Sequence, residues 1–234
     1  MKILPGRRIR SFANVYTNGK SICEIYGKCI ESGDIDTLRS CGSMLTNNSL
    51  RRLKALRIIA GSRRGCKLTE FEGEDIRPTS DRVKEALFNI ISDFVPDARV
   101  LDLFAGSGAL SLEALSRGAA CAVLVDSDKN SIKVIKENTA KTSFEAKAEI
   151  INARAGDYIK KCAEKFDLVF LDPPYNKGFI RSSIELLLEY DRLEDGAAVI
   201  AETDSVEEEY SFDRLELYRR RRYGRTFITV YIKN

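Results

Sequence analysis

Short runs of apolar residues alternate with amphipathic segments through the central part of the chain. The runs are almost continuously apolar and rich in β-formers, which is typical of strands buried on both faces of a parallel sheet. They lie at 99–104, 122–126, 148–152 and 166–171. Segments with helical periodicity follow at 110–117, 129–140 and 155–165. This alternation of strands and helices predicts an α/β fold.

The segments that flank this core are shorter or less regular. Before it, 57–68 is expected to form two short strands around a basic turn, and an amphipathic helix follows with Thr79 or Ser80 as its N-cap. The apolar face of that helix consists of Val83, Leu87, Phe88, Ile90 and Ile91. After the core, the pattern predicts a helix at 185–190, a strand at 197–202 and an antiparallel hairpin of 214–223 and 226–232 around Gly224.

Residues 1–55 have weak periodicity and scattered Gly, Ser and Asn, with at most a short helix at 49–56. We therefore divide the chain into an extension at 1–55, a hairpin and helix that pack on the core at 56–95, and the main domain at 96–234. The extension is expected to be disordered. The alternatives are a basic RNA-binding segment and sequence without a role.

The composition limits the available chemistry. The 234 residues include no histidine, which excludes histidine-based catalysis. The cysteines lie at 23, 29, 41, 66, 121 and 162. They form no Cys-x-x-Cys pair, so we expect no metal site and a cytoplasmic protein with reduced thiols. No apolar run reaches the roughly 18 residues of a membrane span, and we see no secretory signal.

The net charge of +3 is distributed unevenly along the chain. Residues 1–55 hold ten Lys and Arg against four Asp and Glu, so the rest of the chain is slightly acidic. Contacts with nucleic acid must therefore come from local basic patches. Arg63, Arg64 and Lys67 form one candidate patch, and the run 219–222 forms another, with Arg220 and Arg222 on one face if side chains alternate. A solvated hairpin tip and a solvated strand face are the structural alternatives.

Asp172-Pro173-Pro174-Tyr175 follows the most continuous apolar run. Two prolines end any strand because neither donates a backbone N–H. Asp172 and the Pro173 carbonyl can each accept a hydrogen bond from an amine, and Tyr175 offers a ring for a planar base, worth about 1–3 kcal/mol. This combination suits the exocyclic NH2 group of a nucleobase. An isolated motif of this kind is equally compatible with a rigid strand-to-loop turn.

A second candidate site follows the run 99–104. Asp102, Gly106 and Gly108 give a strand, a glycine loop and then a helix, which is typical of nucleotide binding. The third glycine of a dinucleotide motif is missing, and a carboxylate at Asp102 favours a cationic group, so S-adenosylmethionine fits better than NAD. Asp126 ends the next strand about 20 residues after the loop, where a ribose-binding carboxylate belongs. As the N-cap of the next helix, Asp128 fits better than Asp126.

Together these motifs resemble class I S-adenosylmethionine-dependent methyltransferases that act on exocyclic amines, and more narrowly the bacterial RsmD family, which methylates N2 of a guanine in 16S rRNA. The match covers about 56–234. Four motifs carry it in order: Arg57-Ile-Ile-Ala-Gly-Ser-Arg-Arg-Gly65, Arg77-Pro-Thr-Ser-Asp-Arg82, Leu103-Phe-Ala-Gly-Ser-Gly108 and Phe170-Leu-Asp-Pro-Pro-Tyr175.

The resemblance implies a Rossmann-like methyltransferase domain at 96–234, with a seven-stranded, mostly parallel sheet, helices on both faces and an antiparallel C-terminal hairpin. It implies that Asp172, Pro173 and Tyr175 hold the guanine amine. It further implies a cofactor pocket in which Asp126 binds the ribose and Thr79, Asp81 and Arg82 lie near the methionine end. The other implied pocket residues are Asp102, Phe104, Gly106, Gly108 and Arg154.

Two departures from the family pattern stand out. Arg154 occupies a position that is acidic in many relatives, next to the adenine, with Asp157 three residues later. Relatives also begin near a Met-Arg-Ile-Ile-Ala-Gly stretch, which Leu56-Arg-Ile-Ile-Ala-Gly61 matches. We therefore hypothesise that translation begins at Leu56, with AGG codons for Arg51 and Arg52 acting as a ribosome-binding sequence.

The expected activity is methyl transfer from S-adenosylmethionine to N2 of a guanine in 16S rRNA, either free or in an assembling small ribosomal subunit. We expect a monomer in the cytoplasm without membrane contact. One alternative is an adenine-N6 methyltransferase that acts on DNA. The other is a catalytically idle, methyltransferase-like RNA-binding protein.

Overall fold

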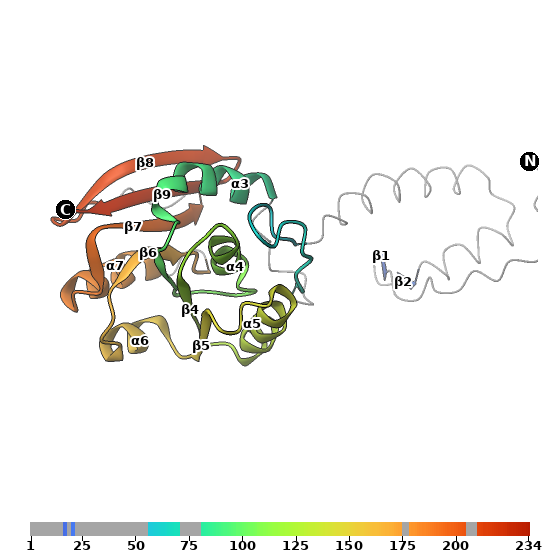
Figure 1. Ribbon diagram of the computed structural model, residues 1–234. Coiled ribbons are helices and arrows are strands. Elements are labelled where there is room, and N and C mark those ends of the chain that lie inside the picture. The colour runs from blue at the N-terminus through green and yellow to red at the C-terminus, as the bar shows by residue number, and fades with distance from the viewer. Residues whose placement is uncertain (1–15, 18–19, 22–55, 71–80, 175–177, 205–209) are drawn as a thin grey trace, which may run out of the picture. The chain divides into compact units, whose positions relative to one another are not determined.

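The computed structural model describes residues 16–17, 20–21, 56–70, 81–174, 178–204 and 210–234 (Figure 1). The chain divides into two compact units, Met1–Lys54 and Ala55–Asn234. In the first, two short strands, β1 (Tyr16–Thr17) and β2 (Lys20–Ser21), pair in antiparallel fashion. The predicted N-cap at Thr79 or Ser80 and most of the helix expected at 49–56 fall outside the described residues.

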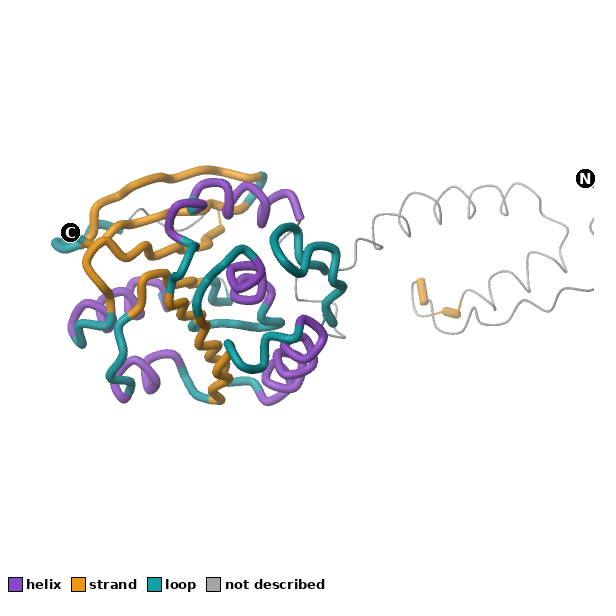
Figure 2. The backbone as a smooth tube through the Cα atoms, in the orientation of Figure 1, coloured by secondary structure: helices purple, strands orange, loops and turns teal. Residues whose placement is uncertain are grey.

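The second unit is built on one seven-stranded sheet with the strand order β5-β4-β3-β6-β7-β9-β8 (Figure 2). Its strands are β3 (Arg99–Asp102), β4 (Cys121–Asp126), β5 (Ala148–Asn152), β6 (Phe166–Leu171), β7 (Leu193–Asp204), β8 (Leu215–Tyr223) and β9 (Thr226–Lys233). Strands β3 to β7 run parallel, whereas β9 is antiparallel to both β7 and β8. The predicted sheet and its C-terminal hairpin are therefore confirmed.

Helices cover both faces of this sheet (Figure 1). The helices are α3 (Asp81–Ile90), α4 (Ala109–Ser116), α5 (Lys129–Thr142), α6 (Ala155–Lys161) and α7 (Phe179–Glu189), with a 3-10 turn at Ser92–Phe94. The first three share one apolar core, through residues such as Phe88, Leu112 and Ile135. Helices α6 and α7 share the other, through Ile159 and Ile184. We call the α3–α4–α5 side the first face of the sheet.

Several element boundaries differ from the sequence-based expectation. Helix α7 begins at Phe179, six residues earlier than predicted, because Gly178 precedes it in a left-handed conformation without a side-chain cap that would signal the start. Helix α6 ends at Lys161, since Cys162 is already extended. Strand β7 starts at Leu193 and includes Gly196 at φ +79°. Its pairing with β6 shifts register between Phe166 and Leu168.

The segment 57–68 forms one antiparallel bridge, between Arg57 and Lys67, rather than two strands. The reason is that the backbone amides of Ile59 and Ala60 donate to the Glu113 carboxylate, at 2.7 and 3.0 Å, instead of to a second strand. The Ser116 hydroxyl donates to the Ala60 carbonyl at 2.6 Å. The basic turn is therefore held against α4, and the predicted hairpin is only partly correct.

Glu113 is the centre of this attachment. It is fully buried and accepts a hydrogen bond from Arg117 Nε at 2.8 Å, and its Oε2 lies 3.6 Å from the buried Lys84 ammonium. Burial lowers the pKa of Lys84, and the charge of Glu113 partly offsets that effect. Lys84 also donates to the Arg57 carbonyl at 2.5 Å. One carboxylate thus connects α3, α4 and the basic turn.

Replacing Glu113 by Ala should destabilise the second unit by about 3–5 kcal/mol, because the change removes the carboxylate beside a buried ammonium and the acceptor of two backbone amides. Urea unfolding followed by circular dichroism measures the effect. Glu137→Ala is the matched control, since that side chain is 52% exposed in its ion pair with Lys141 and its loss should change little. Equal stabilities of the two variants would contradict the proposed role of Glu113.

Candidate active site at the carboxyl edge of the sheet

Four acidic residues follow the apolar parts of four neighbouring strands. Asp126 ends β4, Asp102 ends β3, Asp172 comes directly after β6, and Glu202 lies near the end of β7. Side chains alternate along a strand, and every second residue before each acid belongs to the apolar core of the first face. Those residues are Leu124, Val100, Phe170 and Ile200. All four carboxyl groups are therefore placed on the first face, at the edge where parallel α/β sheets bind ligands.

The glycine loop lies over this edge and is tied to β4. Gly106 N donates to Asp126 Oδ2 at 2.8 Å, and Ala105 N donates to the Val125 carbonyl at 3.1 Å. Gly108 adopts φ +78° as the residue before α4, and a Cβ there would lie 3.1 Å from Leu124 Cδ2. Both the backbone angle and the close approach explain why the sequence has glycine at this position.

Asp102 is 1% exposed, and Ser111 Oγ donates to its Oδ2 at 3.0 Å. Burial raises the pKa of Asp102 to about 7, the Ser111 hydrogen bond opposes this, and the nearby charges of Asp172 and Asp126 add to it. Its other oxygen, Oδ1, is buried without a well-formed hydrogen bond. A buried carboxylate oxygen in this state fits a ligand that brings a cationic or N–H group.

Asp126 differs from Asp102 because both of its oxygens already accept backbone amides, from Gly106 and, at 2.8 Å, from Asp128. Each carboxylate oxygen can accept a second bond, so ribose hydroxyls remain compatible with it. Asp128 caps α5 by accepting from Ser131 N at 3.0 Å, as the sequence predicts. The side chain of Asn152, at the end of β5, donates to the Asp126 carbonyl at 2.9 Å.

The motif Asp172-Pro173-Pro174-Tyr175, predicted to bind the amine, is described only in part. Asp172 is half-buried, Pro173 is buried, and Tyr175 lies outside the described residues. Burial and then the charge of Glu202 raise the pKa of Asp172 well above the usual range. Strands β3 and β6 are parallel neighbours in which Asp102 pairs with Phe170, two residues before Asp172, so Asp172 and the glycine loop after β3 meet at the same edge of the sheet.

Of the other predicted pocket residues, Phe104 and Arg154 follow β3 and β5 at the same edge, whereas Asp81 and Arg82 lie at the start of α3. Phe104 is half-buried, 5.8 Å from the Phe179 ring between centroids, and Arg154 is exposed at the start of α6, directly after β5. Asp81 begins α3, where Arg57 Nε lies 3.1 Å from its Oδ2, and Arg82 is exposed. Thr79 lies outside the described residues.

The two predicted basic patches occupy different places. The β8–β9 turn lies at the carboxyl edge, because Thr226 at the start of β9 pairs with Asp204 at the end of β7. Arg220 and Arg222 share a face, as alternation predicts, and both guanidinium groups lie over the Phe227 ring, at 4.9 and 5.5 Å from its centroid.

The other patch is the basic turn with Arg63, Arg64 and Lys67, all exposed. Arg63 N donates to Ser116 Oγ at 2.9 Å, at the last residue of α4. Because α4 has eight residues, the turn is roughly 12 Å along the helix axis from the glycine loop. The C-terminal patch lies at the carboxyl edge but on the other face of the sheet from the four acids, because Arg221 pairs with Ile228 of the first face whereas Arg220 and Arg222 pair with Thr229 and Phe227.

Glu202 is the site residue that the sequence reading missed, since it was treated only as the end of a strand. It is 6% exposed at the carboxyl edge. A signal was available, because an acid that follows the apolar run 197–201 repeats the arrangement of the other three acids. What the sequence did not contain was the position of β7 next to β6.

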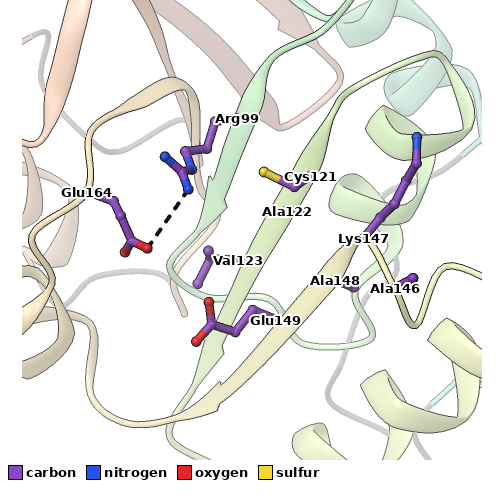
Figure 3. A pocket seen from close by; sticks show the side chains of 9 residues that line it. All are labelled: Arg99, Cys121, Ala122, Val123, Ala146, Lys147, Ala148, Glu149 and Glu164. Carbon is purple, nitrogen blue, oxygen red and sulfur yellow. Dashed lines mark ion pairs between the residues drawn. The ribbon is translucent and has the colours of Figure 1, made fainter.

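A cavity of about 230 Å³ lies at the opposite edge of the sheet (Figure 3). Its lining includes the first residues of three strands, Arg99, Cys121 and Ala148, and Arg99 is paired with Glu164 at 3.9 Å. Its lining on β4 runs from Cys121 to Val123, three to five residues before Asp126, which places it roughly 10–17 Å from that residue. It is therefore separate from the acidic crevice.

The order of the strands, the antiparallel C-terminal pair and the glycine loop after β3 define the class I methyltransferase fold. A sequence profile described as "Conserved hypothetical protein 95" matches residues 56–232. The chain belongs to this family, which is the RsmD family. The resemblance noted in the sequence is thereby confirmed.

Individual relatives agree with this assignment. "Ribosomal RNA small subunit methyltransferase D" of Haemophilus influenzae is 42% identical over 153 residues, which is 64% of this chain and 79% of that protein. YlbH of Bacillus subtilis is 36% identical over 182 residues, 76% of this chain and 99% of that protein. The solved structure of yhhF from Escherichia coli superposes with a TM-score of 0.69 and 37% identity, covering 76% of this chain and 97% of that one.

Proposed function

We propose that the protein transfers a methyl group from S-adenosylmethionine to the exocyclic N2 amine of a guanine in 16S ribosomal RNA. The observation that carries the proposal is the pairing of β3 with β6, in which Asp102 lies opposite Phe170, so that Asp172 and the glycine loop come together at the carboxyl edge of the sheet. Relatives at 40–42% identity that are named small-subunit rRNA methyltransferases support the substrate class.

S-adenosylmethionine fits the residues of this chain. Asp102 Oδ1 is available to a cationic or N–H group, Asp126 can accept from ribose hydroxyls, and Gly108 keeps the loop clear of side-chain atoms. When bound, this cosubstrate supplies an electrophilic methyl group on a sulfonium centre. The protein's task is then positioning and charge stabilisation rather than covalent catalysis.

The residues near β6 act on the amine. The N2 lone pair of guanine is delocalised into the ring, and acceptors at Asp172 and the Pro173 carbonyl favour a more nucleophilic nitrogen and stabilise the positive charge that develops on it. Tyr175 is expected to stack on the base. The target base must be unpaired or flipped to reach the crevice.

The crevice itself is acidic and repels phosphate, so RNA must be held by the surrounding basic patches. We expect Arg220 and Arg222 at the β8–β9 hairpin, and Arg63, Arg64 and Lys67 on the basic turn, to contact phosphates at some distance from the target base. We propose that the protein acts in the cytoplasm as a monomer on rRNA within an assembling small subunit. In the described part of the chain, no helix is long and apolar enough to cross a membrane.

Replacing both Arg220 and Arg222 by Ala should weaken rRNA binding uniformly across sequences. The slope of log affinity against log salt concentration should fall by about 2, one for each lost phosphate contact. Filter binding at several salt concentrations measures this, with Arg181→Ala, an exposed arginine on α7, as the control. An unchanged slope would mean that these two arginines form a solvated strand face.

Labelled methyl transfer to purified small-subunit rRNA, assembling subunits and duplex DNA tests the proposed activity. Nucleoside mass spectrometry of rRNA from cells with and without the gene identifies the product. Loss of N2-methylguanosine with the gene supports the proposal. Transfer to adenine in DNA would favour the N6 alternative, and failure to bind S-adenosylmethionine in calorimetry would favour an idle RNA-binding protein.

A further inference from the structure

The positions of Asp172 and Glu202 bring two carboxyl groups together. Strands β6 and β7 are parallel neighbours in which Leu171 pairs with Ala201, so Asp172 and Glu202 occupy the next positions along the two strands. Both continue the alternation of the first face, after Phe170 and Ile200. Neighbouring strands lie about 4.8 Å apart, which places the two side chains side by side.

Their surroundings disfavour two charges. Glu202 is 6% exposed, and its neighbour on the other side, Ile228 of β9, is apolar and buried. Two carboxyl groups in such a site share a proton, and their titration belongs to the pair. Burial and then the negative charge of Glu202 raise the pKa of Asp172, in agreement with this geometry.

The other charged groups around the pair have partners or lie further out. Asp102 of β3 bonds to Ser111, and Asp126 of β4 bonds to two backbone amides. From α3, which packs on the same face through Phe88 and Phe170, Lys84 is directed to Glu113 and the Arg57 carbonyl. From β8, Arg221 is exposed opposite Ile228.

We propose that Glu202 is a second carboxyl group of the amine-binding site, and that the Asp172–Glu202 pair takes up the proton that the target amine loses. This rests on the proposed methyl transfer. The amine nitrogen bonds to the methyl carbon as the methyl–sulfur bond breaks, and that bond's electron pair stays on sulfur. The nitrogen, now cationic, then gives a proton to Asp172 and keeps the N–H electron pair.

The proton balance of the pair follows from the shared proton. Before transfer, the two carboxyl groups hold one proton and one negative charge, and after transfer they hold two protons and no charge. The original proton passes to Glu202 as Asp172 receives the new one. The pair returns to its first state by releasing a proton to water once the product has left.

The decisive measurement follows the carboxyl carbon of Asp172 by ¹³C NMR in full-length protein without substrates. In Glu202→Gln, the pKa of Asp172 should fall by at least about one pH unit, because a neighbouring negative charge is removed. Glu194→Gln, the same change at an exposed position of β7, should leave it unmoved. An unchanged titration of Asp172 in Glu202→Gln would overturn the pair.

Single-turnover methyl transfer tests the proton uptake. At saturating rRNA, Glu202→Gln should slow methyl transfer about 10²-fold while KM stays unchanged. The acidic limb of its pH–rate profile should also be displaced. Glu202→Asp should recover part of the rate. A shifted titration with a wild-type rate would overturn proton uptake by the pair. If the wild type methylates no rRNA, the proposed function fails, while the titration still decides whether the pair exists.

Discussion

Replacing Asp172 by Ala is expected to slow methyl transfer by about 10²–10³-fold while leaving affinity for S-adenosylmethionine within threefold of the wild type. The two effects should separate because, in the proposed site, Asp172 after β6 accepts from the amine, whereas residues at the ends of β3 and β4 hold the cosubstrate. Single-turnover transfer of labelled methyl to small-subunit rRNA measures the first quantity, and calorimetry measures the second.

Asp172→Asn sharpens this experiment because it keeps the shape and one acceptor oxygen but removes the charge. If the charge stabilises the developing ammonium, Asn should be nearly as slow as Ala. Asp213→Ala, an exposed acid before β8, is the control and should behave as wild type in both measurements. Parallel loss of transfer and cosubstrate affinity would instead make Asp172 a structural residue.

The sequence allowed the chemistry of each strand end to be predicted, since an acid after a buried apolar run is a local feature. Asp102, Asp126 and Asp172 were recognised in this way. The local pattern did not show which strand ends lie side by side, because strand order depends on packing between distant segments. Glu202 lies 30 positions after Asp172 and becomes its neighbour only because β7 pairs with β6.

The basic turn is a second case in which a distant residue changes a structure predicted from the local sequence. Its β-rich composition predicts a hairpin, and local pairing between Arg57 and Lys67 does occur. The amides of Ile59 and Ala60 instead find a carboxylate more than 50 positions away, on a helix whose buried acid looks unremarkable in sequence. A side-chain acceptor of this kind can replace a strand partner without any change in the local sequence pattern.

The protonation of Asp102 is expected to link cosubstrate binding to stability. In the folded protein its pKa is about 7, whereas an unfolded chain has an ordinary value of about 3.9. Between these values the folded state holds a proton that the unfolded state has lost. The carboxyl therefore costs stability progressively as pH rises from about 4 to about 7, at up to about 1.4 kcal/mol per pH unit.

Asp102→Asn should accordingly flatten the dependence of stability on pH. The amide is neutral throughout, so its stability relative to wild type should increase by on the order of 2–4 kcal/mol between pH 4 and pH 8. Any cost of leaving the new side-chain amide N–H without an acceptor is independent of pH. The slope of stability against pH is therefore informative even if the variant is less stable than wild type at pH 4. Urea unfolding at a series of pH values measures it, with Asp213→Asn as the control.

The same variant should lose cosubstrate affinity by at least about tenfold, because the neutral amide no longer offers a charge to a cationic group. In the wild type, affinity should fall as pH drops below about 7, and binding near pH 7 should release a proton, seen as a buffer-dependent enthalpy in calorimetry. The variant should show neither effect. If wild type and Asp102→Asn had the same pH dependence of binding and of unfolding, the buried carboxyl of Asp102 would not be the group that meets the cationic end of the cosubstrate.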